Sequence, residues 1–131
     1  MLGSAQTASL FGAIIKMRLV IVESPYGGDV ERNEAYARAA MHDCIRRGEA
    51  PFASHLLYTQ PGVLNDQVKA ERELGIKAGL EWGDKADATV VYTDLGVSEG
   101  MRQGMARATI AGRPIEMRSI PDWCSGARLA S

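Results

Sequence analysis

Three short segments of the sequence carry side chains that could do chemistry on a small molecule. The first, SPYGGD at residues 24–29, places two glycines just ahead of an expected helix start. Glycines let a ligand approach the backbone closely, and the first N–H groups of a helix bind anions. This segment is therefore typical either of a cradle for a phosphate or a sugar, or of a plain tight turn.

The second and third segments add polar side chains. His55 begins the second, residues 55–66. Asp94, Ser98 and Glu99 stand in the third, TDLGVSEG at residues 93–100. A carboxylate such as Glu99 can attack a sugar as a nucleophile or accept a hydrogen bond from a sugar hydroxyl. The helix dipole alone also favours an acid in a first turn, so Glu99 has a structural explanation as well. A single histidine such as His55 is open to both interpretations, a structural one and a ligand contact.

Several well-known functional motifs are absent from the sequence. The glycines do not form GxGxxG, no Gly-Lys-Ser/Thr ends a Walker A loop, and no HExxH or Cys/His cluster occurs. We therefore expect no metal site and no bound cofactor. His42 falls within an expected helix and is interpreted as a solvated surface residue.

Strands and helices alternate along the chain, and their order would bring the three segments together. Apolar β-branched runs predict strands, and apolar residues at helical spacing predict helices. The expected strands are residues 17–23, 51–59, 87–94 and 113–120, and the expected helices are residues 29–47, 66–82 and 98–111. This order predicts one α/β domain with a parallel sheet and helices on its faces. Ligands bind beyond the carboxyl ends of the strands in such sheets, and there the three segments would meet.

Apolar residues recur at helical spacing in two of the expected helices. In the first, Tyr36 and Cys44 share an apolar face, so we expect a buried thiol at Cys44. In the second, Leu74, Ala78 and Trp82 stand four residues apart, as helical spacing allows.

Composition and charge exclude some classes of protein. The chain is 46% hydrophobic and 24% charged, as is typical of a soluble globular domain, and its net charge of −1 provides no basic field for nucleic acid or an anionic membrane. We interpret residues 1–16 as a flexible extension or, alternatively, an oligomer contact, residues 17–120 as the domain, and residues 121–131 as a tail. Cys44 and Cys124 have no metal-type spacing, and a cytoplasmic location fits best.

Taken together, the segments resemble a known family. SPYGGDVERN, PFASHLLYTQ, ERELGI, ADATVVYTDLGVSEGM and AGRPIE follow one another as in the nucleoside 2-deoxyribosyltransferase-like superfamily. More narrowly, they resemble a small branch common in phages and their bacterial hosts, over nearly all of residues 17–120. The resemblance implies a single-domain, flavodoxin-like parallel sheet with helices on both faces. It also implies a pocket for a nucleoside or nucleotide at the strand ends, and assembly into a homo-oligomer.

The resemblance also implies an activity. Transferases of this superfamily cleave the N-glycosidic bond of a nucleoside through a glutamate nucleophile, and a base or water then resolves the intermediate. We expect the catalytic residues here to be Glu99 and Asp94. The expected substrate-binding residues are Ser24, Pro25, Tyr26, Gly27, Asn33, His55 and Ser98.

The nucleophile position departs from the family pattern. In the transferases the glutamate stands ten positions ahead of the proline of a Gly-Lys-Pro turn, and the same count from Pro114 reaches Gly104. Glu99, more than one helical turn earlier, is the candidate substitute. The sequence therefore predicts cleavage or base transfer at an N-glycosidic bond, with a non-catalytic nucleotide-binding module as the alternative that Gly104 favours.

Two further classes stay open. A flavin-binding domain would have to use Trp82 or Trp123, and both lie outside the strand-end loops. A protein that binds other proteins and no small ligand is the last alternative.

Overall fold

The computed structural model describes residues 16–123 of the 131-residue chain. The predictions for residues 1–15, including the alternative oligomer contact, and those for residues 124–131, including Cys124, lie outside the described residues.

Parallel strands form a four-stranded sheet in the order β2-β1-β3-β4. The strands are β1 (Arg18–Glu23), β2 (Glu49–Phe52), β3 (Ala88–Tyr92) and β4 (Ile115–Arg118). In the centre of the sheet, Val20 of β1 lies between Pro51 of β2 and Ala88 of β3. This strand order, with helices on both faces, is that of flavodoxin-like domains, so the predicted fold class is confirmed.

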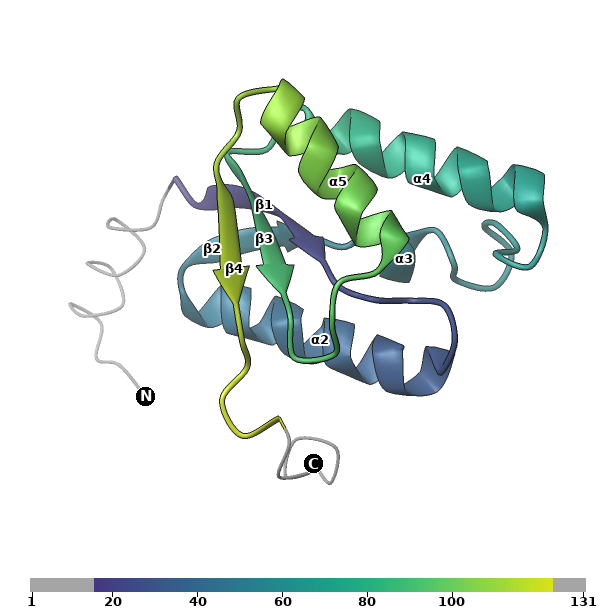
Figure 1. Cartoon of the computed structure of the whole chain (residues 1–131), viewed down its shortest axis with the longest axis horizontal. Coiled ribbons are helices and arrows are strands. Elements are labelled where there is room, and N and C mark those ends of the chain that lie inside the picture. Colours follow the sequence, from purple (N-terminus) through teal and green to yellow (C-terminus); the bar gives the residue numbers. More distant parts are fainter. Residues whose placement is uncertain (1–15, 124–131) are drawn as a thin grey trace, which may run out of the picture.

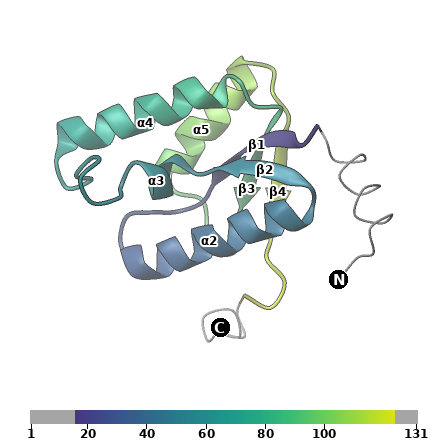
Figure 2. The same ribbon diagram turned by 180° about the vertical axis from the view of Figure 1, so that it is seen from behind.

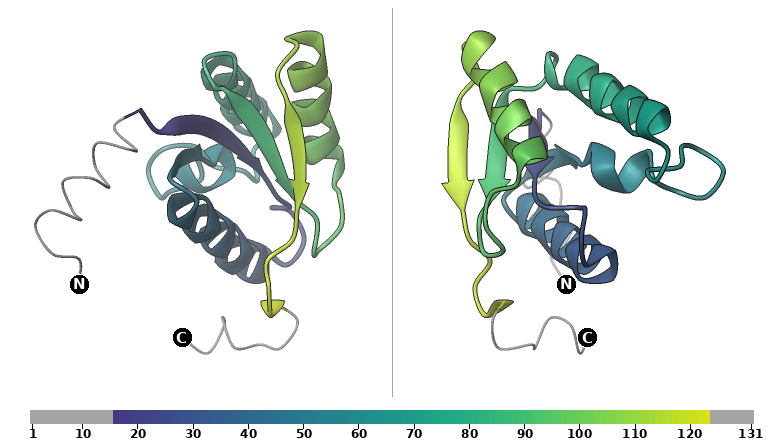
Figure 3. Two further views of the ribbon diagram at one scale, coloured as in Figure 1. Left: turned by 90° about the vertical axis from the view of Figure 1, so that its left-hand side faces the viewer. Right: turned by 45° about the vertical axis from the view of Figure 1, so that its right-hand side comes forward.

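Three long helices cover the two faces of the sheet. They are α2 (Val30–Arg46), α4 (Lys69–Gly83) and α5 (Glu99–Ile110). Figure 1 shows α2 on one face and α4 with α5 on the other, and Figure 3 shows the same layers from the side. Right-handed crossovers require this arrangement, because the chain moves one way from β1 to β2 and the opposite way from β2 to β3 and β4. Within residues 16–123, no helix is both long and apolar enough to cross a membrane.

Side chains of β1 alternate between the two faces, as the pleat of a strand requires. Val20 and Val22 belong to the main hydrophobic core, which they share with Tyr36 and Cys44 of α2. The Cys44 side chain is fully buried, so the prediction of a buried thiol is confirmed. Because successive residues of a strand face opposite sides, Glu23 points toward α4 and α5.

The prediction of a strand over residues 51–59 is wrong in its second half. β2 ends at Phe52, and residues 54–57 form the short helix α3 (Ser54–Leu57), which Figure 2 shows between α4 and α2. The backbone N–H of Tyr58 donates to the carbonyl of Ser54, which closes the turn. An apolar run of this length is compatible with a strand or a helix, and its periodicity cannot distinguish them. His55 therefore lies on a helix that follows the strand.

The expected helix over residues 66–82 is present as α4, but most of its large apolar residues are exposed. Leu74 and Trp82 are 57% and 58% exposed, and the side of α4 that faces the protein is formed by glycines at positions 75, 79 and 83. A Cβ atom at Gly79 would lie 2.6 Å from the side chain of the first residue of α3. The glycines thus let α4 approach α3 and β1 closely.

A buried ion pair connects the two edge strands. The guanidinium of Arg118 in β4 donates to both carboxylate oxygens of Glu49 in β2, at 2.8 and 2.7 Å, and both residues are less than 9% exposed. The twist of the sheet, visible in Figure 3, brings these diagonal corners together. Two-point hydrogen bonding of this kind fixes the position of both side chains.

Candidate functional site

A cavity of about 460 Å³ opens at the carboxyl edge of the sheet, on the side of α4 and α5. Its walls are the end of β1 with the loop that follows it, helix α3, the glycine side of α4 and the start of α5. The loops after β1 and β3 run to helices on opposite faces, so the cavity lies at the point where the strand order reverses. Open α/β sheets bind their ligands at this point.

Most of the residues that the sequence singles out line this cavity, and three do not. Those that line it are Ser24, Tyr26, Gly27, His55, Ser98 and Glu99. Those that lie outside its lining are Pro25, Asn33 and Asp94. Each of the three sequence segments therefore contributes to the cavity.

Asn33 holds the backbone of the first loop, residues 24–29, through side-chain hydrogen bonds. It is 1% exposed, and its side-chain amide donates to the backbone carbonyls of Tyr26 and Gly27, both at 2.9 Å. Gly28 has a φ of 92°, a conformation that residues with a side chain rarely adopt. Asn33 and Gly28 together fix the path of the loop, while Gly27 leaves open space beside its backbone.

Asp94 fastens the loop after β3 to the rest of the domain. Its Oδ2 accepts hydrogen bonds from the hydroxyl of Tyr36 at 2.6 Å and from the backbone N–H of Ile120 at 2.8 Å. These contacts join α2 to the segment after β4. We therefore assign Asp94 a structural contribution and leave it out of the chemistry proposed below.

Ser24 and His55 form a hydrogen-bonded pair on the cavity wall. Ser24 Oγ lies 2.7 Å from His55 Nε2, and the ring of Tyr26 stands edge-on to the imidazole with centroids 6.3 Å apart. Burial lowers the pKa of His55 to about 4, because the charged imidazolium loses its hydration. His55 is therefore neutral at pH 7 and can donate or accept one hydrogen bond at each ring nitrogen.

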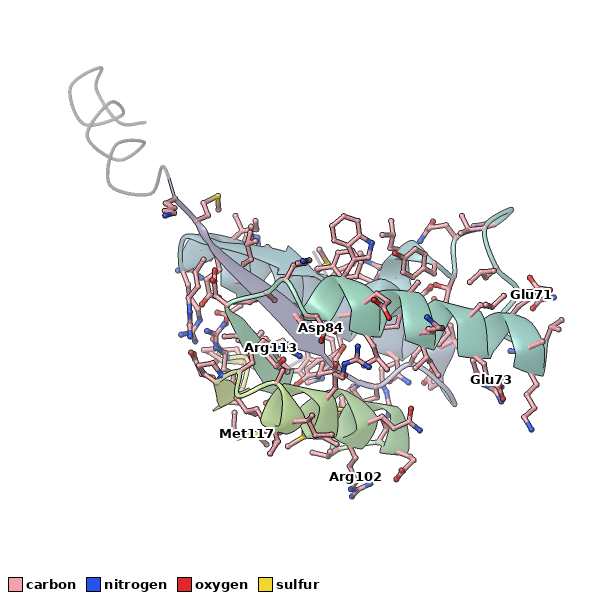
Figure 4. All side chains as sticks on the ribbon, turned by 90° about the horizontal axis from the view of Figure 1, so that it is seen from above. Glu71, Glu73, Asp84, Arg102, Arg113 and Met117 are labelled. Atoms are coloured by element: carbon pink, nitrogen blue, oxygen red, sulfur yellow. The ribbon has the colours of Figure 1, made fainter. Side chains whose placement is uncertain are left out.

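Ser98 and Glu99 stand at the rim of the cavity, at the start of α5. Ser98 Oγ accepts a hydrogen bond from the backbone N–H of Met101 and so caps the helix. The Glu99 side chain is 79% exposed, and its carboxylate lies 4.0 Å from Arg102. Figure 4 shows Arg102 projecting away from the body of the protein. Glu99 therefore lies at the rim of the cavity, with its side chain open to water and beside Arg102.

Glu23, the last residue of β1, is a cavity residue that our sequence interpretation did not single out. Burial raises the pKa of its carboxyl to about 8, and the positive charge of Arg113 opposes this shift. A carboxyl with such a pKa is largely protonated at pH 7. One signal in the sequence could have found it, namely an acidic residue that ends an apolar strand directly before the SPY loop.

The Glu23 carboxyl fills the space beside Gly104. A Cβ atom built on Gly104 would lie 2.5 Å from Cδ of Glu23 and closer still to Oε2. Gly104 is the position that the count from the proline predicts for a carboxylate. A carboxyl group is thus present beside position 104, but it comes from β1.

Arg113 supplies a positive charge at the inner end of the cavity. Its side chain is 6% exposed, Nε donates to the Thr89 hydroxyl at 3.1 Å, and Nη1 lies 3.9 Å from Asp84. Figure 4 shows Arg113 and Asp84 close together near the end of α4. Because these partners fix the guanidinium, it is a constant electrostatic feature of the site.

Comparison with known proteins places the chain in a family. The model of a domain of unknown function, DUF7768, matches residues 18–118, so the chain belongs to this family. Searches of curated proteins and of solved structures found no match.

Proposed function

We propose that this member of the DUF7768 family binds a nucleoside or a 5′-nucleotide and cleaves its N-glycosidic bond, either by hydrolysis or by exchange of the base. The observation that carries the proposal is the cavity itself. It gathers two carboxyl groups of different exposure, Glu23 and Glu99, with the neutral pair formed by Ser24 and His55.

The size and lining of the cavity suit such a ligand. Its volume of about 460 Å³ lies within the range of ordinary small-molecule sites. Tyr26 and Tyr58 offer aromatic rings to a base, and rings of this kind bind bases by stacking. Gly27 offers open backbone to a sugar or a phosphate.

Two carboxyl groups in different surroundings are what a glycosidic reaction requires. Glycosidases use one protonated carboxyl to assist the leaving group and one ionised carboxylate to support the positive charge that develops on the sugar. Half-buried Glu23, with its raised pKa, matches the first description, and exposed Glu99 matches the second. In this proposal Glu99 acts at the sugar, as nucleophile or as electrostatic partner.

A binding module without chemistry is the second candidate function. Gly104 favours it, because the position at which the resemblance predicts the nucleophile has no side chain. The exposure of Glu99 also favours it, since a carboxylate open to water is a weak nucleophile.

A screen for base release tests the proposal. The protein is incubated with ribonucleosides, deoxyribonucleosides and their 5′-monophosphates, with an acceptor base in half of the reactions, and free base is measured by chromatography. We expect release from at least one substrate, and a large loss of release in Glu99→Ala. Glu73→Ala is the matched control, since Glu73 is a second exposed glutamate that does not line the cavity. A folded wild-type protein that binds a nucleotide but releases no base would support the binding module.

The homo-oligomer and the cytoplasmic location remain predictions. Light scattering coupled to size-exclusion chromatography tests the first, and a single species with the mass of one chain would contradict it.

A further inference from the structure

The carboxyl group of Glu23 lies at the cavity and has no hydrogen-bond or ion-pair partner among the described residues. Within residues 16–123, no hydrogen bond or ion pair reaches its oxygens, although Arg113 is near enough to affect its titration. A carboxyl that only supports the fold is normally tied to a hydrogen-bond partner, and the half-buried Glu23 has none among the described residues. Glu23 instead presents its oxygens to the cavity, where a ligand could use them.

Helix α5 makes room for this carboxyl. Gly104 lies in the middle of the helix, where glycine is less favourable than alanine. A Cβ atom there would overlap the Glu23 carboxyl. Gly100, one turn earlier, has no such neighbour, since the nearest atom to its Cβ position is Ser98 Oγ at 3.9 Å. The close approach is therefore specific to position 104.

The surroundings of Glu23 favour its neutral form. His55 is neutral at pH 7, and Arg113 is the buried positive charge. The remaining charged residues of the lining are Asp66, Glu71, Arg72 and Glu99, and two tyrosines complete the titratable groups. Desolvation outweighs the attraction of Arg113 and raises the pKa of Glu23 to about 8. At pH 7 the group is an O–H donor aimed into the cavity.

We propose, on the basis of the function proposed above, that Glu23 is the catalytic acid that protonates the leaving base. As the bond between C1′ and the base nitrogen breaks, the bonding electron pair stays with the base. The proton of Glu23 passes to a ring nitrogen of the base, which leaves as a neutral molecule. Water then attacks C1′, and its proton returns to the Glu23 carboxylate. The sum is nucleoside plus water giving base plus sugar, with Glu23 restored.

The experiment compares two substrates in wild-type protein and Glu23→Gln. One is the nucleoside identified in the screen, and the other is a 4-nitrophenyl glycoside of the same sugar, whose leaving group departs without a proton. We expect Glu23→Gln to lower the turnover of the nucleoside by about 100-fold or more and that of the nitrophenyl glycoside by less than about 10-fold. The wild-type rate on the nucleoside should fall as the pH rises through about 8, and this fall should be absent in Glu23→Gln.

Each other outcome overturns the inference. Unchanged nucleoside turnover in Glu23→Gln would show that Glu23 is not needed, and equal losses on both substrates would show that it does not act as an acid. In either case the proposed function stands, because wild-type protein still releases base. If wild-type protein releases base from none of the substrates, the proposed function is overturned, and this inference with it.

A second variant moves the carboxyl without removing it. Gly104→Ala should displace Glu23 and lower nucleoside turnover at least about 10-fold, because acid catalysis depends on placement within an ångström. Gly100→Ala, in the same helix, is the control for folding and should raise the temperature of thermal unfolding, whereas in Gly104→Ala the overlap with Glu23 offsets that gain and the variant should unfold near the wild-type temperature. Full turnover in Gly104→Ala would overturn the inference.

Discussion

Replacing Glu23 with glutamine should change how the stability of the protein depends on pH. The folded protein holds the Glu23 proton more tightly than the unfolded chain, since its pKa rises from 4.5 to about 8. Its contribution to stability is therefore fully present below about pH 4.5 and is lost as the pH rises to about 8. His55 acts in the opposite direction: its pKa falls from 6.5 to about 4, so its contribution is present above pH 6.5 and is lost as the pH falls toward 4.

The two effects overlap and then separate. Between about pH 4.5 and 6.5 they oppose each other, and between about pH 6.5 and 8 only Glu23 acts. One pKa unit corresponds to about 1.4 kcal/mol, so the shift of Glu23 has an upper limit of about 5 kcal/mol. Water in the open cavity weakens desolvation, and we expect a loss of about 2–4 kcal/mol across the whole range. Glutamine cannot ionise. The stability of Glu23→Gln should therefore show only the increase between about pH 4 and 6.5 that His55 causes.

Urea unfolding between pH 5 and 9, followed by tryptophan fluorescence, measures this difference. The free energy of unfolding of wild-type protein should fall above pH 6.5, while that of Glu23→Gln stays level there. The free energy of unfolding of Glu23→Gln should therefore increase relative to that of wild-type protein as the pH rises. Parallel curves over the whole range would show that the Glu23 carboxyl is well hydrated and would refute the reasoning from burial.

Three further substitutions test the parts that hold the site together. Asn33→Ala removes both hydrogen bonds to the first loop, and we expect a loss of about 1–3 kcal/mol in the free energy of unfolding, measured by urea denaturation; an unchanged midpoint would contradict it. Glu49→Gln removes one of the two carboxylates that pair with the buried Arg118 and leaves Glu116, so it should cost about 1–3 kcal/mol, whereas Glu49→Leu combined with Arg118→Met should cost less. Gly27→Val should weaken nucleotide binding in calorimetry without changing thermal stability, because no atom lies within 4 Å of its Cβ position; equal affinity would show that the loop is only a turn.

Much of the fold could be predicted because several local signals agree. The apolar run of β3 is buried at every position, and a serine caps α5 where the sequence places it. The strand predicted over residues 51–59 failed because that apolar run contains two elements of different kinds. The inward side of α4 could not be found from its apolar residues, because glycines form that side and hydrophobic periodicity does not register a residue without a side chain.

Part of the candidate site could likewise be predicted from the sequence, and part depends on contacts between residues far apart in the chain. Residues 24, 55 and 98 could be placed at one cavity from the sequence because the carboxyl ends of parallel strands share an edge. Glu23 could not, since the direction of its side chain depends on how β1 sits in the sheet, and its partner in space is a glycine 81 positions later in the chain. Gly104 alone suggests an enzyme without its nucleophile. Together with Glu23 it describes a helix that makes room for a carboxyl from another element, and so an absent side chain becomes a reason to expect acid chemistry at this site.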